Sequence, residues 1–179
     1  MEFKQIPQRK IPNILITGTP GTGKTSLAQQ LSQSTGYVHH DISLLAKEKN
    51  LCDGWDDEYK CYIIDEDKIC DELENQMNLG GNIVDYHGCD FFPERWFDLV
   101  VVLRTNNTVL YDRLSKRNYH QKKLTDNIES EIFGVILEEA EDSYKKEIIL
   151  ELENNEINDL ERNLDLILEW IKKWESNQK

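Results

Sequence analysis

Short apolar runs along the chain separate longer segments in which apolar residues recur with helical spacing. The first clear run is Asn13–Thr17, and a continuous apolar run of this length is typical of a strand covered on both faces by helices. Residues 148–152 fit a strand too, although a continuing helix is an alternative there. The segments expected to form strands are 13–17, 37–40, 82–85, 99–103 and, with that alternative, 148–152.

The segments between the runs carry apolar residues at intervals of three and four, which predicts helices with one buried face. Polar residues predict a loop at 53–59 and a break at 118–123. In the long helix expected at 126–146, the inward residues are Ile132, Phe133, Ile136, Ala140 and Tyr144. The other expected helices are 24–34, 66–77, 109–117 and 160–174, with a short one near 42–46.

The alternation of strands and helices predicts the fold class α/β, with a parallel sheet and helices on both of its faces. The chain has 179 residues, which is the length of one ordinary domain, so we expect a single domain over residues 1–179. Ligands of such sheets bind at the carboxyl ends of the strands. Side chains that directly follow the strands are therefore the first functional candidates.

One glycine-rich turn follows the first strand. Gly18 to Thr25 reads GTPGTGKT and matches G-x-x-x-x-G-K-[ST] in full, between a predicted strand and a predicted helix. The glycines allow backbone N–H groups to point at phosphate oxygens, and the helix N-terminus adds partial positive charge. We expect Lys24 to reach the β and γ phosphates of a nucleotide and the Thr25 hydroxyl to ligate Mg²⁺.

A carboxylate at the end of a neighbouring strand would complete a magnesium site. Asp85 ends the run 82–85, so we expect it to be the magnesium partner, with Asp90 as the alternative. His87 stands two residues beyond Asp85. It could position a water molecule or donate a hydrogen bond to a group at the phosphate site, and the sequence leaves both roles open.

The charge balance is strongly acidic, with 34 Asp and Glu against 21 Lys and Arg. Such a protein repels polyanions, so we expect no direct nucleic-acid binding. No apolar window has the length of a bilayer span, and the residues after Met1 do not resemble a signal peptide, so we expect a soluble intracellular protein without membrane contact. The four cysteines form no CxxC pair, which favours free thiols.

The arginines favour phosphoryl transfer. Arg113 and Arg117 are four residues apart, share a helix face, and lead into the polar break at 118–123. Planar cations that close over a migrating phosphate supply much of the catalysis in this reaction. Pairing of these arginines with surface carboxylates such as Asp112 is the alternative.

A GTP switch is a less favoured interpretation of the same loop. Asp85 to Gly88 fits D-x-x-G, a pattern that such switches also carry, yet the chain contains no N-K-x-D for reading guanine. Guanine preference would be its distinguishing property.

Four segments together resemble the adenylate kinase isoenzyme 6 family, also described as nuclear adenylate kinases or coilin-interacting nuclear ATPases. The resemblance covers about residues 12–174. It implies the P-loop nucleoside monophosphate kinase fold, with a five-stranded parallel sheet, a monophosphate-binding arm at 41–64 and a short lid at 116–126. The segments are ILITG at 14–18, GTPGTGKT at 18–25, DYHGCDFFPERWF at 85–97 and KKLTDNI at 122–128.

By matching position, the resemblance assigns site residues. Asp85 and His87 fall on the family's metal and catalytic segment, and Arg113 lies beside Arg117 of the lid. Where the family has an arginine in the arm, this chain has Lys47, a point charge without the bidentate fork, which we expect to anchor the monophosphate. The residues assigned to ATP are Gly21, Gly23, Lys24, Thr25, Ser26 and Arg117.

The implied function is Mg²⁺-dependent transfer of the γ-phosphate of ATP to AMP, with dAMP, CMP and dCMP as further acceptors and with ATPase activity. The alternative is an ATP-gated assembly factor in maturation of the small ribosomal subunit, which would bind a basic ribosomal protein. The resemblance also implies a location in nucleus and cytoplasm, and we expect a monomer. The catalytic set would be Lys24, Asp85, His87, Arg113 and Arg117, and the metal ligands Thr25 and Asp85.

Overall fold

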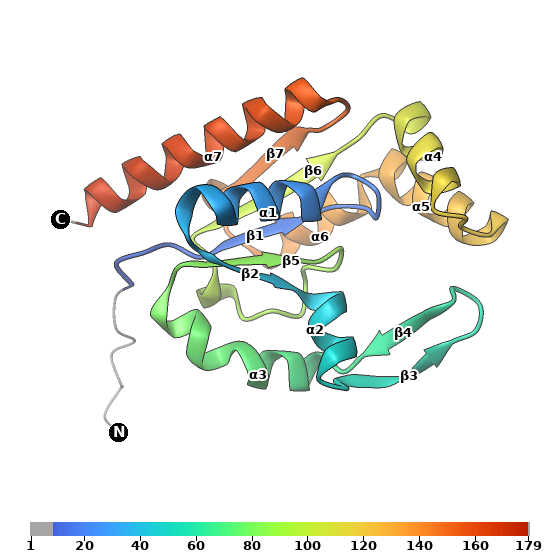
Figure 1. Cartoon of the computed structure of the whole chain (residues 1–179), viewed down its shortest axis with the longest axis horizontal. Coiled ribbons are helices and arrows are strands. Elements are labelled where there is room, and N and C mark those ends of the chain that lie inside the picture. Colours follow the sequence, from blue (N-terminus) through green and yellow to red (C-terminus); the bar gives the residue numbers. More distant parts are fainter. Residues whose placement is uncertain (1–8, 179) are drawn as a thin grey trace.

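The computed structural model describes residues 9–178, so residues 1–8, on which the expectation about a signal peptide partly rests, and residue 179 lie outside it. Its centre is a five-stranded sheet in the order β2-β5-β1-β6-β7 (Figure 1). Every pairing in this sheet is parallel, which confirms the prediction. The last strand begins at Ile149, one residue later than expected, and continues to Glu153, so the alternative of a continuing helix is wrong. The strands are β1 (Ile14–Thr17), β2 (Val38–Asp41), β5 (Asn82–Asp85), β6 (Leu99–Arg104) and β7 (Ile149–Glu153).

Helices cover both faces of the sheet, because side chains along each strand alternate between two cores. Ile14 and Ile16 share one core with α1 and α7, whereas Leu15 shares the other with α3 and α6. Figure 1 shows α7 and α1 on one side of the sheet and α3 on the other. The helices are α1 (Lys24–Thr35), α2 (Ile42–Glu48), α3 (Glu66–Leu79), α4 (Asn107–Lys116), α5 (Gln121–Phe133), α6 (Val135–Ser143) and α7 (Ile157–Asn177).

The loop expected at 53–59 is instead part of an antiparallel hairpin. Its strands are β3 (Cys52–Asp56) and β4 (Cys61–Ile64), and they form a separate two-stranded sheet. Trp55 and Tyr62 face each other across the pair with ring centroids 4.9 Å apart. Cross-strand aromatic contacts of this kind stabilise a hairpin whose sequence is otherwise polar. Figure 1 shows the hairpin projecting from the sheet toward α4 and α5.

The single helix expected at 126–146 is wrong. Gly134 ends α5 with φ +66, in the left-handed region, and α6 starts at the next residue. The break changes which face is buried: Ile132 and Phe133, expected inward, are 52% and 76% exposed, while Glu131 is 3% exposed. A glycine inside an apolar period therefore acts here as a helix terminus. The helix α5 also begins earlier than expected, at Gln121 within the predicted polar break.

None of the helices in residues 9–178 combines the length and the apolar composition that a membrane span requires. The cysteines Cys52, Cys61, Cys70 and Cys89 are free thiols.

Candidate active site

The glycine-rich loop lies between β1 and α1, at the carboxyl edge of the sheet. Gly23 is the N-cap of α1 with φ +94, a backbone conformation that favours glycine. A Cβ at this position would collide with the side-chain nitrogen of Asn154, which donates a 2.7 Å hydrogen bond to the Thr22 carbonyl. The other predicted nucleotide-binding residues lie alongside: Gly21 within the loop, and Thr25 and Ser26 exposed in the first turn of α1.

Lys24 extends back over the loop. Its Nζ donates hydrogen bonds to the carbonyl oxygens of Gly18 (2.9 Å) and Thr19 (3.2 Å). Burial lowers the pKa of Lys24 to about 8, and the Arg117 guanidinium acts in the same direction while Asp85 opposes it. At pH 7 the side chain is therefore an ammonium group that carries a desolvation cost, and an anion bound beside it would relieve that cost.

Asp85 ends β5, and β5 pairs directly with β1, so this carboxylate lies next to the start of α1. Its side chain is 4% exposed. Thr25 Oγ1 donates a 2.7 Å hydrogen bond to Asp85 Oδ2, and His39 Nε2 lies 3.1 Å from the same oxygen. The two predicted magnesium ligands are thus in contact. The position of His39 against Asp85 had no sequence signal beyond its place near the end of β2.

The oxygen donors of Thr25 and Asp85 fit Mg²⁺, which binds hard oxygen ligands and commonly takes only one or two from protein. Among residues 9–178, no group of three or more His, Cys, Asp or Glu side chains could hold a metal ion. A Mg²⁺ ion here would take its further ligands from water and from the phosphates of a bound nucleotide. Asp90, the alternative ligand, is exposed beyond the end of β5.

A cavity of about 470 Å³ opens above the loop. Its lining comes from the loop, β5, the hairpin and the segment from α4 to α5, and includes Lys24, Tyr59, Asp85, His87, Arg117 and Lys123. A second cavity, of about 510 Å³, lies between α2 and the hairpin and is lined by Lys47, Trp55 and Tyr62. Both cavities are lined by Ser43, Cys61, Tyr86 and His87. The two spaces therefore adjoin at the residues that follow β5.

A known family model and several curated proteins match this chain over most of its length. A family model described as an AAA domain matches residues 14–134. Curated homologues of adenylate kinase isoenzyme 6 are 58% identical in Dictyostelium discoideum, covering 93% of this chain and 95% of that protein, and 52% identical in Drosophila melanogaster, covering 91% and 93%. This chain belongs to the adenylate kinase isoenzyme 6 family. A Saccharomyces cerevisiae member, FAP7, is 43% identical over 91% of this chain and 83% of its own.

Solved structures agree on the fold of this adenylate kinase isoenzyme 6 family member. Shikimate kinase from Bacteroides thetaiotaomicron superposes with a TM-score of 0.61 at 14% identity, covering 90% of this chain and 98% of that one. Shikimate kinase from Acinetobacter baumannii gives 0.59 at 18% identity, covering 89% and 94%. At such identities the likeness concerns the fold alone. Together with the five-stranded parallel sheet, it confirms the predicted P-loop nucleoside monophosphate kinase fold.

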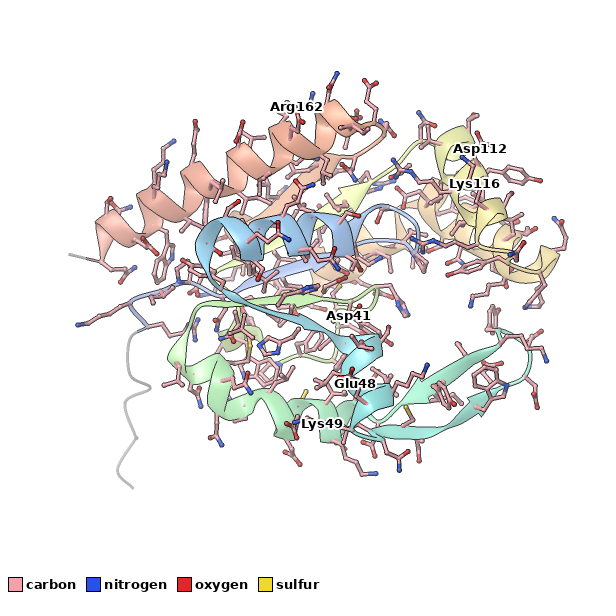
Figure 2. All side chains as sticks on the ribbon, in the orientation of Figure 1. Asp41, Glu48, Lys49, Asp112, Lys116 and Arg162 are labelled. Atoms are coloured by element: carbon pink, nitrogen blue, oxygen red, sulfur yellow. The ribbon has the colours of Figure 1, made fainter. Side chains whose placement is uncertain are left out.

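The two arginines expected at the lid occupy different surroundings. Arg117, the C-cap of α4, lines the 470 Å³ cavity. The Arg113 guanidinium donates to the backbone carbonyls of Gly21 (3.1 Å), Asn154 (3.0 Å) and Asn155 (2.8 Å). Arg113 thus fastens the glycine-rich loop to the segment after β7. Its partners are these carbonyl groups and, at 3.4 Å, the Thr105 hydroxyl, whereas Asp112 lies exposed on α4 (Figure 2).

His87 lies where the two cavities meet and lines both of them. The surrounding protein and then the ammonium groups of Lys24 and Lys123 hold the pKa of His87 well below its ordinary value, although Asp85 opposes the shift. The imidazole is accordingly neutral at pH 7. A neutral ring can both donate and accept a hydrogen bond, which is compatible with either of the two roles left open by the sequence.

The tip of the hairpin contacts α5 beside the 470 Å³ cavity, which Tyr59 and Asp126 both line, and this contact had no signal in the sequence. Tyr59 donates its hydroxyl hydrogen to Asp126 Oδ2 at 2.7 Å. Lys122 Nζ donates to the Tyr59 hydroxyl oxygen at 3.0 Å and pairs with Glu58 at 3.2 Å. We call Glu58, Tyr59, Lys122 and Asp126 the hairpin–α5 clasp. It connects the expected arm to the expected lid.

Proposed function

We propose that this protein is a Mg²⁺-dependent nucleoside monophosphate kinase that transfers the γ-phosphate of ATP to AMP, with dAMP, CMP and dCMP as further acceptors. The observation that carries the proposal is the pair of adjoining cavities, one above the glycine-rich loop and one beside Lys47, which meet at His87. A donor in the first and an acceptor in the second would direct their phosphates toward each other. The adenylate kinase names of the relatives support the same reaction.

The donor side follows from the loop. Its backbone N–H groups and the Lys24 ammonium would hold the triphosphate, with Lys24 exchanging the carbonyl oxygens of Gly18 and Thr19 for phosphate oxygens. Arg117 would approach the migrating group from the end of α4, while Arg113 keeps Gly21 in position behind it. Fixed positive groups stabilise the charge that develops on the transferring phosphate.

Thr25 and Asp85 would hold Mg²⁺, which supplies charge neutralisation and orientation of the phosphates when it is bound. His39 Nε2, 3.1 Å from Asp85 Oδ2, would help to orient that carboxylate. On the acceptor side, Lys47 would attract the monophosphate within the arm, residues 41–64, and the lid, residues 116–126, would exclude water. Asp41 lies at the start of that arm, as the last residue of β2 and the N-cap of α2 (Figure 2).

The transfer itself needs no covalent enzyme intermediate. An oxygen of the acceptor phosphate forms a bond to the γ-phosphorus while the bond from that phosphorus to the β–γ bridging oxygen breaks, and ADP leaves with the bridging oxygen. The neutral His87 ring would contribute a hydrogen bond at the junction of the cavities. Positioning and electrostatic stabilisation therefore account for the role of each residue.

Purified full-length protein would be assayed with Mg²⁺, with ATP or GTP as donor, and with a panel of AMP, dAMP, CMP and dCMP. We expect nucleoside diphosphates to form from the acceptors faster than ATP is hydrolysed without them. Lys24→Met, which removes the ammonium group, is expected to lower turnover on the order of a hundredfold or more. If no acceptor yields a diphosphate above the hydrolysis background, the kinase assignment is wrong, and preference for GTP would favour a switch.

A second output, an ATP-gated assembly step in maturation of the small ribosomal subunit, is favoured by the charge of the chain. A net charge of −13 suits a basic ribosomal protein as partner, because complementary charge accelerates encounter. ATP hydrolysis would then reset the complex in nucleus or cytoplasm. We expect the ATPase rate to rise when such a protein is added without AMP. An unchanged ATPase rate would argue against this assembly function.

A further inference from the structure

A buried acidic side chain connects α5 to the glycine-rich loop. Glu131 lies in the last turn of α5 and is 3% exposed, and Thr19 in the loop is 1% exposed. Thr19 Oγ1 donates a 2.6 Å hydrogen bond to Glu131 Oε2. A hydrogen bond to an ionised acceptor is shorter and stronger than one between neutral groups. This contact joins residues 112 positions apart in the chain.

The other oxygen of Glu131 is held by partners on the sheet. Oε1 accepts hydrogen bonds from Arg104 Nε and from the Thr105 backbone N–H, both at 2.9 Å, and Arg104 Nη2 donates to the Glu131 carbonyl oxygen at 2.8 Å. A buried carboxylate is tolerated only when its charge is paired and its oxygens are hydrogen-bonded. Arg104 and Thr105 therefore orient the carboxylate, and its remaining oxygen is directed at Thr19.

Thr19 is in turn adjacent to the catalytic lysine. Its carbonyl oxygen accepts hydrogen bonds from Lys24 Nζ at 3.2 Å and from Thr22 Oγ1 at 2.8 Å. The orientation of the Thr19 residue thus affects both the path of the loop and the direction of the Lys24 ammonium. The hydroxyl of Thr19 donates to Glu131, and its carbonyl accepts from Lys24 Nζ, the group that would bind phosphate.

We propose that Glu131 is a positioning residue for the phosphate-binding loop, which it holds through the Thr19 hydroxyl in the conformation that binds the donor triphosphate. The inference rests on the proposed kinase function. Because α5 also presents Lys123 and Asn127 to the 470 Å³ cavity, the same contact sets the lid helix and the loop in one arrangement. Neither Glu131 nor Thr19 approaches the reacting atoms, so both act through the loop.

Thr19→Val is the sharpest test, because it removes the hydroxyl, keeps the side-chain shape and leaves the Arg104–Glu131 pair in place. Thr19→Ser restores the hydroxyl. The matched control is Glu151→Gln, which removes the negative charge from the exposed partner of Arg104 (Nη1 to Glu151 Oε1, 3.0 Å) without touching the loop. For each variant, the dissociation constant of ATP would be measured by calorimetry, the KM of each substrate by initial rates, and the stability without ligand by thermal melting.

For Thr19→Val we expect ATP to bind about tenfold more weakly, from the loss of one hydrogen bond to a charged group, with the KM of AMP within about twofold of wild type. Thr19→Ser should recover most of that affinity, and Glu151→Gln should match wild type. Glu131→Gln is expected to weaken ATP binding at least as much as Thr19→Val, and Thr19→Val decides the question if Glu131→Gln does not fold.

The inference is overturned if Thr19→Val binds ATP as wild type does, or if its affinities for ATP and AMP fall together in proportion to lost stability. Calorimetry reads ATP binding without turnover. Failure of the kinase assignment would therefore appear separately, as a wild-type protein that binds ATP and forms no diphosphate.

Discussion

Thr25 and Asp85 lie 60 positions apart in the chain and share a 2.7 Å hydrogen bond from the hydroxyl of the first to Oδ2 of the second. The contact exists because β1 and β5 are neighbours in the sheet, so that the residue ending β5 meets the first turn of the helix that follows β1. It brings together the two oxygen donors expected to bind magnesium, and His39 approaches the same carboxylate oxygen from β2.

Asp85→Asn is therefore expected to lower turnover on the order of a hundredfold while leaving the fold intact, because the amide can still accept the Thr25 hydrogen bond but carries no charge for the metal. Initial rates measured across a range of Mg²⁺ concentrations, with a thermal melt alongside, would check this. Asp90→Asn is the matched control, since Asp90 is exposed beyond β5. If turnover of Asp85→Asn were within threefold of wild type, Asp85 would not be a ligand of the catalytic metal.

Loss of the hairpin–α5 clasp should weaken the binding of both substrates. Tyr59→Phe removes the hydroxyl that is hydrogen-bonded to Asp126 and Lys122. One hydrogen bond of this kind contributes about 1 kcal/mol to stability. We expect the KM values for ATP and AMP each to rise about fivefold, because the contact joins the arm expected to hold the monophosphate to the lid beside the 470 Å³ cavity expected to hold ATP. Steady-state kinetics would measure it. Tyr111→Phe, at an exposed position on α4, should behave as wild type.

An unchanged KM for both substrates in Tyr59→Phe would show that the clasp does not take part in closing the site. If Tyr59→Phe lowered the unfolding temperature as much as a core substitution does, Tyr59 would instead contribute to stability alone.

Gly134→Ala distinguishes a broken helix from a continuous one. With φ +66 at Gly134, alanine is expected to lower the free energy of unfolding by about 1 kcal/mol, because a Cβ disfavours this backbone region. The nearest atom to an added Cβ is Arg104 Nη1 at 3.6 Å, an ordinary van der Waals contact, so a steric clash does not add to this loss of stability. Urea unfolding would measure the change, with Gly36→Ala, another left-handed C-cap, as the comparison. A stabilising effect would indicate one continuous helix.

Acid should destabilise the protein partly through His40. This ring is 9% exposed, and its Nε2 lies 2.9 Å from Asn82 Oδ1. Burial lowers the pKa of His40 below its ordinary value of 6.5, with a smaller contribution from His39 in the same direction, while the Asn82 hydrogen bond opposes it. Below pH 6.5 the unfolded chain therefore takes up a proton that the folded protein does not, and stability falls as pH falls through that window.

The uptake of this one proton is expected to change the free energy of unfolding by at most about 1.4 kcal/mol per pH unit. Chemical unfolding at pH 5.5, 6.0 and 6.5 would measure the slope, and His40→Gln, which keeps a hydrogen-bonding group, should make it shallower. Equal slopes for the two proteins would mean that His40 titrates alike in the folded and unfolded states.

Much of the architecture could be predicted from local sequence. The three central strands β1, β5 and β6 are short, mainly apolar runs, and the loop from Gly18 to Thr25 carries its glycines, lysine and threonine at fixed covalent spacing. Asp85 could be singled out because a carboxylate that ends a buried strand must lie at the binding edge of a parallel sheet. These features depend on neighbouring residues and on backbone geometry, which a linear pattern records.

The polar hairpin and the break at Gly134 were missed because their local patterns are ambiguous. A run such as CDGWD has few apolar residues to indicate a strand, and its pairing with Cys61–Ile64 depends on a turn and on the contact between Trp55 and Tyr62. A single glycine within a helical period is compatible with either continuation or termination.

The amino-acid sequence alone thus determined the parallel α/β architecture, the phosphate-binding loop and the carboxylate beside it. Only the tertiary structure decided that His39 meets Asp85, that Tyr59 reaches Asp126, and that Glu131 is buried against Thr19. The physical reason is that hydrogen bonds between distant residues depend on how helices and strands pack. A side chain's position along the chain does not reveal which remote group its packing will bring within 3 Å or so of it.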